Sequence, residues 1–178
     1  MLVQHCREYS TLMLLQVFTL SIKADLENIE SISLPEDSSY TLTVKDSAGD
    51  DQREGVVVSR LEEQELSGSR GTAHFALKWS RDARHEASLS LQHIKGVTRA
   101  LTAADAGKFV PIVAFECRGL DPIAWQPQDG FVIRAPSGMV WEDVDLSSGE
   151  WAEYDEKSGE AVSVMELEWR FDTYRPKK

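Results

Sequence analysis

The stretch of residues 109 to 138 constrains the fold more than any other part of the sequence. Two apolar segments rich in β-branched residues, 110 to 117 and 131 to 133, flank a segment that glycine and proline interrupt. The interrupting residues are Gly119, Pro122, Pro127 and Gly130. Because glycine and proline favour turns and β-branched residues favour strands, the pattern predicts a strand, a long turn and a second strand.

Period-two alternation of apolar side chains predicts several further strands. The clearest is residues 161 to 171, where nearly all apolar side chains fall on one face and a slip near Met165 predicts a bulge. Similar patterns predict strands at residues 15 to 22, 40 to 44 and 56 to 58, and a hairpin of residues 74 to 79 with 87 to 91. Residues 46 to 55 are expected to form a polar loop, and residues 102 to 105 a capped helical turn or a short loop. We therefore expect a mainly β protein with few, short helices.

A weak internal repeat suggests that the chain has two similar parts. Residues 23 to 29 align with residues 117 to 123, and the strand that ends at Trp79 aligns with the strand that ends at Trp169. We interpret the repeat as two similar antiparallel β-sheet halves packed together, because neither sheet can bury its apolar face alone. Chance similarity between β segments is the alternative. The predicted parts are an N-terminal extension (residues 1 to 12), a first half (13 to 100), a second half (101 to 172) and a basic tail (173 to 178).

The chain of 178 residues is acidic, with a formal net charge of -11. Nucleic acids bind clusters of Lys and Arg, so we expect no nucleic-acid partner. We find neither a secretory signal nor an apolar segment of the roughly 18 residues that a membrane helix needs, and we expect no membrane partner and a cytoplasmic or nuclear location. The cysteines Cys6 and Cys117 form no disulfide framework and are expected to be free thiols.

The sequence lacks recognisable catalytic motifs. It has no Gly-x-Ser-x-Gly elbow, its four histidines are dispersed, and residues 68 to 71 resemble a hairpin turn rather than a phosphate-binding loop. Cys117 lies in an apolar strand pattern, where a buried and unreactive thiol is expected. We therefore predict no enzymatic activity and no cofactor. The enzyme hypothesis that stays open is a small-molecule pocket between the sheets containing Cys117 or perturbed carboxylates.

Acidic residues and tryptophans are concentrated near the C-terminus. From Glu142 to Glu168, ten acidic residues accompany one lysine. A solvated acidic face is the simplest interpretation, and a docking surface for a basic protein partner is the functional one. Tryptophans in β proteins usually belong to the core, but Trp125 lies between two prolines in the predicted turn and is a candidate exposed anchor. The predicted partner-binding residues are Trp125, Trp141, Trp151, Asp143, Asp145, Glu153, Asp155 and Glu156.

Four groups of residues, taken together, are specific enough to suggest a family. They are residues 115 to 122 with 126 to 131, residues 151 to 157, residues 24 to 29 and residues 68 to 71. Through them the chain resembles the eukaryotic CXXC-motif-containing zinc-binding protein family, a domain of unknown function, over roughly residues 13 to 172. The resemblance implies a mainly antiparallel β protein of two related halves, with one structural zinc ion held by two Cys-x-x-Cys pairs on facing hairpins of the first half. It also implies a loose link to metal homeostasis or chaperone-type partners.

The zinc-binding cysteines that the resemblance implies are absent from this chain. The matching positions are Asp46 with Gly49 and Trp79 with Asp82. A structural zinc site needs about four ligands, usually Cys or His. We therefore expect a divergent member without its metal, whose hairpins are held by packing, with Trp79 where a ligand stood.

Together these observations predict a non-catalytic protein-interaction or adaptor module. The alternative is a metal-binding or metal-homeostasis accessory protein with a substitute site. The substitute ligands would come from Asp46, Asp82, His74 and His85.

Overall fold

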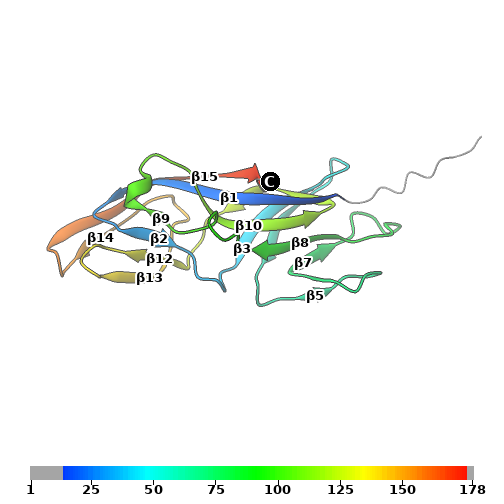
Figure 1. Cartoon of the computed structure of the whole chain (residues 1–178), viewed down its shortest axis with the longest axis horizontal. Coiled ribbons are helices and arrows are strands. Elements are labelled where there is room, and N and C mark those ends of the chain that lie inside the picture. The colour runs from blue at the N-terminus through cyan, green and yellow to red at the C-terminus, as the bar shows by residue number, and fades with distance from the viewer. Residues whose placement is uncertain (1–13, 176–178) are drawn as a thin grey trace, which may run out of the picture.

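The computed structural model describes residues 14 to 175, which form fifteen strands (Figure 1). The only helical element within these residues is the short 3-10 helix η1 (Ala103–Asp105), and Thr102 and Asp105 form its capping box. The expectation of a mainly antiparallel β protein with sheets packed together is confirmed, as is the capped turn. The predicted extension at residues 1 to 12, which includes Cys6, and residues 176 to 178 of the predicted tail lie outside the described residues.

The largest sheet has six strands in the order β14-β15-β1-β10-β8-β7. Its strands are β14 (Trp151–Asp155), β15 (Glu160–Thr173), β1 (Leu15–Glu27), β10 (Val110–Arg118), β8 (Ala87–Gln92) and β7 (Phe75–Leu77). β1 lies between β15 and β10 and pairs antiparallel with both. One face of β1 places Leu20, Ile22 and Ala24 in the core, as a strand with period-two alternation does when one face is buried.

Three smaller sheets complete the fold. The three-stranded sheet contains β11 (Leu120–Gln126), β3 (Tyr40–Asp46) and β4 (Gln52–Val58). The four-stranded sheet contains β13 (Val140–Val144), β12 (Phe131–Arg134), β2 (Ser31–Ser33) and β9 (Leu101–Thr102). The two-stranded hairpin contains β5 (Gln64–Glu65) and β6 (Thr72–Ala73). Buried residues of the six-, three- and four-stranded sheets join in one hydrophobic core.

The strand order has an internal symmetry. In the six-stranded sheet, β1 and β10 occupy equivalent central positions, β15 and β8 lie outside them, and β14 and β7 are the equivalent edges. In the same way, the strands β2, β12 and β13 of the four-stranded sheet are equivalent to β11, β3 and β4 of the three-stranded sheet. Each of these two small sheets therefore contains strands from both parts of the chain, because β11 pairs with β3 and β2 pairs with β12. The strand before Trp79 corresponds to β14 in this order, so its predicted alignment with the strand ending at Trp169 is wrong.

A continuous row of aromatic rings crosses the core. Neighbouring ring centroids are separated by 5.7 to 6.4 Å. The row runs through Tyr40, Phe115, Phe171, Trp169, Trp125 and Phe131. All of these contacts are tilted or edge-to-face, the arrangement that the charge distribution of aromatic rings favours.

Two local predictions are wrong and one is confirmed. The predicted long turn contains strand β11, which can hold Pro122 because it is an edge strand whose register shifts between Pro122 and Ala124. The predicted polar loop at residues 46 to 55 is shorter, because β4 already begins at Gln52. The slip near Met165 is a bulge, where the pairing of β15 with β1 shifts register.

Candidate functional site

The β3–β4 and β7–β8 hairpins carry the four positions at which the resemblance implies zinc ligands. Asp46 ends β3, and its carboxylate accepts a hydrogen bond of 3.0 Å from the backbone of Ala48. Gly49 donates from its backbone to the Asp46 carbonyl at 3.3 Å, which closes the turn. In the β7–β8 connection, Trp79 is half-buried against the core and Asp82 is exposed.

A single carbonyl oxygen joins the tips of these two hairpins. The indole Nε1 of Trp79 donates to the oxygen of Gly119 at 2.9 Å, and the backbone nitrogen of Ser47 donates to the same oxygen at 3.4 Å. Gly119 connects β10 to β11 with a φ of 68°, a conformation that glycine adopts without strain. The Ser47 hydroxyl also donates to Asp121 at 2.7 Å. The hairpin tips are thus held to the β10–β11 junction by hydrogen bonds.

The proposed substitute metal site is not assembled in the described part of the chain. Among residues 14 to 175, no group of three or more His, Cys, Asp or Glu side chains is placed to hold a metal ion. His74 uses its Nδ1 to accept a 2.8 Å hydrogen bond from the backbone of Leu91, and its burial lowers its pKa. His85 is exposed on the neighbouring connection.

The predicted acidic docking surface contains a pair of tryptophans. Trp141 on β13 and Trp151 on β14 stack edge-to-face with ring centroids 5.3 Å apart. Both rings are half-buried, and they join the edge strands of two different sheets at one end of the molecule (Figure 1). We use the name acidic tryptophan surface for this pair together with the exposed carboxylates Asp143, Asp145, Glu153 and Glu156.

Two predicted partner-binding residues do not belong to this surface. Trp125 is 4% exposed, because β11 is a strand whose inner face turns its indole into the core against Phe131 and Trp169. Asp155 is 1% exposed. Its carboxylate accepts a hydrogen bond from the Ser137 hydroxyl, which ties the β14–β15 turn to the β12–β13 turn, and one from the backbone of Lys157 within its own turn. These bonds hold the pKa of Asp155 below its usual range.

Comparison with known proteins decides the family. A model of the eukaryotic CXXC motif containing zinc binding protein family matches residues 19 to 172, which is most of the chain. The chain belongs to this family. The CXXC motif containing zinc binding protein of Rattus norvegicus is 34% identical over 155 residues, which cover 85% of this chain and 95% of the rat protein.

Solved structures share the fold of this family member. The crystal structure of C1orf123 is similar with a TM-score of 0.79 and 30% identity, covering 89% of this chain and 99% of that chain. A hypothetical protein from Plasmodium falciparum is similar with a TM-score of 0.82 and 24% identity, covering 88% and 99% of the two chains. The latter likeness concerns the fold alone.

The residues at the four implied positions do not fit the zinc ion for which the family is named. Gly49 has no side chain, and the nitrogen of the Trp79 indole carries the proton that it donates to Gly119. Only Asp46 and Asp82 retain side-chain oxygens, and tetrahedral structural zinc sites are built mainly from thiolates and imidazoles.

Cys117, the cysteine within the described residues, does not contribute to either hairpin. Its side chain lies in the core with 1% exposure, and burial raises the pKa of the thiol. The prediction that this cysteine is buried is confirmed.

Within residues 14 to 175, no helix has the length and apolar character that a membrane span requires.

Proposed function

We propose that this family member is a non-catalytic protein-interaction module that no longer binds zinc, and that it binds a basic segment of a partner protein. The observation that carries the proposal is the stacked pair Trp141 and Trp151, half-exposed among carboxylates where two sheet edges meet. Aromatic residues of this kind are enriched among the residues that dominate binding energy in protein interfaces.

The proposed loss of zinc rests on the chemistry of the hairpin tips. The Trp79 indole and the Ser47 backbone both donate to the Gly119 carbonyl, so the contact between the hairpins is made without charged ligands. The β7–β8 hairpin also packs Trp79 against the core. Packing and neutral hydrogen bonds thus supply a connection that a structural metal supplies in other small folds.

The charge of the surface favours a basic partner. Asp143, Asp145, Glu153 and Glu156 are all exposed, and the Lys157 ammonium is turned to the carbonyl oxygen of Gly138 at 3.2 Å. An arginine side chain can contact the face of an indole and a carboxylate at the same time. The edge strand β14 also presents backbone groups that an extended segment can pair with.

A peptide titration tests this proposal. The probe is an extended peptide of alternating arginine and threonine, and the control peptide carries glutamine in place of each arginine. We expect the arginine peptide to change the fluorescence of the tryptophans, and to bind more weakly as the salt concentration rises, because exposed charges are screened. Equal binding of the glutamine peptide would contradict a charge-driven interface.

Matched variants locate the binding surface. The double variant Glu153→Gln, Glu156→Gln removes two exposed carboxylates of the acidic tryptophan surface, one on β14 and one in the turn that follows it, and should weaken binding several-fold. The control Glu62→Gln, Glu63→Gln removes two exposed carboxylates next to β5, which lies away from β14 (Figure 1), and should leave binding unchanged. If both double variants weaken binding equally, only the net charge matters and the proposed surface is wrong.

A further inference from the structure

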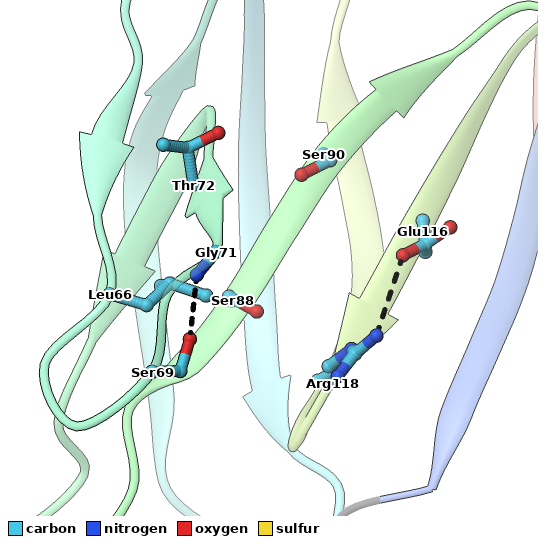
Figure 2. A pocket seen from close by; sticks show the side chains of 8 residues that line it. All are labelled: Leu66, Ser69, Gly71, Thr72, Ser88, Ser90, Glu116 and Arg118. Carbon is cyan, nitrogen blue, oxygen red and sulfur yellow. Dashed lines mark hydrogen bonds and ion pairs between the residues drawn. The ribbon is translucent and has the colours of Figure 1, made fainter.

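A polar pocket of about 110 Å³ lies between the six-stranded sheet and the β5–β6 hairpin (Figure 2). Its floor is the sheet face formed by β8 and β10, and its roof is the hairpin. The lining residues are Ser88, Ser90, Glu116 and Arg118 on the floor and Leu66, Ser69, Gly71 and Thr72 on the roof. It is separate from the acidic tryptophan surface, which is formed by other strands.

The floor of the pocket places one cation and one anion side by side, each next to a hydroxyl. Ser88 is paired across the strands with Arg118, and Ser90 is paired with Glu116. These side chains share a face because β8 turns the alternate residues Leu89 and Leu91 into the core. The closest nitrogen of Arg118 lies 3.9 Å from Glu116, too far for a good hydrogen bond. The two charges are thus only loosely satisfied by each other.

The roof is held over the floor by specific hydrogen bonds. The Glu86 carboxylate, just before β8, accepts from the backbone and the hydroxyl of Ser67 at 2.7 and 2.8 Å. Within the hairpin, Leu66 donates from its backbone to the Gly71 carbonyl at 3.0 Å. The Ser69 oxygen accepts from the Gly71 backbone at 3.0 Å, so its hydroxyl proton is available to another acceptor. The pocket is therefore partly open to solvent, with a roof fixed by hydrogen bonds and polar groups on both walls.

We propose that this pocket binds a small zwitterion of the α-amino acid class, such as glycine or serine, with its carboxylate at Arg118 and Ser88 and its ammonium at Glu116 and Ser90. A simple anion would meet the Glu116 carboxylate, and a simple cation would meet the Arg118 guanidinium. A molecule that carries both charges satisfies both ends, and the hydroxyls supply further hydrogen bonds. A volume of about 110 Å³ exceeds the need of a single water.

A titration followed by backbone NMR tests the proposal with the full chain. The probes are glycine and serine, which carry both charges, and acetate, methylammonium and glycerol, which carry one charge or none. We expect the zwitterions to shift the amide signals of residues 66 to 72, 88 to 90 and 116 to 118. Acetate and methylammonium should bind at least about tenfold more weakly, because each lacks one charge-assisted contact.

Variants at the two charges must weaken binding if the assignment is correct. Arg118→Gln and Glu116→Gln should each lower the affinity for glycine at least about tenfold. The matched control is Asp172→Asn, because Arg170 and Asp172 form a similar pair two residues apart, at 2.8 Å, on a strand that does not line the pocket. The control should bind glycine like the unmodified chain.

Three results would overturn the assignment. One is the absence of shifts at the pocket residues with glycine and serine at high millimolar concentration. Another is equal binding of acetate or glycerol, which would make the pocket an anion or polyol site. The last is unchanged glycine affinity in Glu116→Gln, a variant of nearly the same shape whose amide can still accept from Gln92, as Glu116 does at 3.2 Å, so a folding defect is not expected.

Discussion

The indole nitrogen of Trp79 lies 2.9 Å from the carbonyl oxygen of Gly119, to which it donates a hydrogen bond. This contact ties the β7–β8 hairpin to the junction between β10 and β11. The backbone nitrogen of Ser47 shares the same oxygen, so both hairpins of the implied zinc region meet at Gly119. We expect this point to carry the stability that a metal ion would otherwise supply.

Two substitutions of Trp79 should distinguish how much its packing and its hydrogen bond each contribute to the free energy of unfolding. Trp79→Ala removes both and should lower the free energy of unfolding by about 3 kcal/mol, the low end for a large aromatic because the ring is half-buried. Trp79→Phe keeps most of the packing and should cost about 1 kcal/mol. Urea unfolding measures both. An alanine variant as stable as the unmodified chain would show that this contact does not hold the hairpins.

Restoring the cysteines should restore metal binding if the hairpins still face each other as the family resemblance implies. The variant carries Asp46→Cys, Gly49→Cys, Trp79→Cys and Asp82→Cys. A side chain at position 49 would lie 3.0 Å from the Asp46 carboxylate, but that oxygen disappears in the variant. We expect one zinc per chain by elemental analysis.

The unmodified chain, purified without chelator, is the control for this experiment and should contain far less than one equivalent of metal. Stoichiometric zinc in that control would contradict the proposed loss of the site. A four-cysteine variant that folds without binding zinc would contradict the assignment of the four positions.

The two tryptophans Trp125 and Trp151 should respond differently to mutation. Trp125→Ala removes a buried ring from the aromatic row and should cost about 3 to 5 kcal/mol in unfolding free energy. Trp151→Ala removes a half-buried ring at a sheet edge and should cost about 1 to 2 kcal/mol while weakening the arginine peptide. Urea unfolding and peptide titration on the same samples check this difference. Peptide binding unaffected by Trp151→Ala would remove the support for this surface.

Protonation of the Asp155 carboxylate should make the stability of the fold decrease at acidic pH. Its hydrogen bonds with Ser137 and the backbone of Lys157 lower its pKa in the folded state. This contribution is therefore present above the pKa of an unfolded aspartate, about 4, and is lost as the pH falls through the lower folded value. In Asp155→Asn, the melting temperature should be lower at neutral pH and should fall less on acidification. Glu156→Gln, at an exposed position, should behave like the unmodified chain; an equal loss there would contradict the assignment.

Ionisation of the Tyr40 hydroxyl should make the stability of the fold decrease at alkaline pH. Burial raises its pKa to about 12, because the charged phenolate would lose its hydration in the core. The contribution is complete below the unfolded pKa of about 10 and is lost as the pH rises toward 12, a change on the order of 3 kcal/mol. Denaturant unfolding at several alkaline pH values measures it. In Tyr40→Phe this loss should be smaller, and an unchanged alkaline loss would assign it to other groups.

Local patterns in the sequence were informative where one face of a strand is buried. The alternation at residues 161 to 171 correctly predicted the inner face of β15 and its bulge, because side-chain direction in a strand has a fixed period. The same logic failed at β11. There Pro122 and neighbouring turn-forming residues indicated a turn, and pairing with β3 overrides that local preference.

The candidate binding surfaces were likewise predicted only in part from the sequence. The tryptophans and acids near the C-terminus could be found by counting, but the counts did not distinguish buried Trp125 and Asp155 from the exposed residues around them. The pocket under the β5–β6 hairpin had no sequence signal. Its floor combines Ser88 and Arg118, which become neighbours only through the pairing of β8 with β10.

The amino-acid sequence by itself determined the β class, the inward faces of most strands and the family, because periodicity and residue identity are local properties. Only the tertiary structure decided that β11 and β2 cross to the other part's small sheet, and that Trp79 meets Gly119. The physical reason is that backbone hydrogen bonds between strands are nearly the same for every sequence. Strand partners are therefore chosen by how all the apolar faces fit together in one shared core.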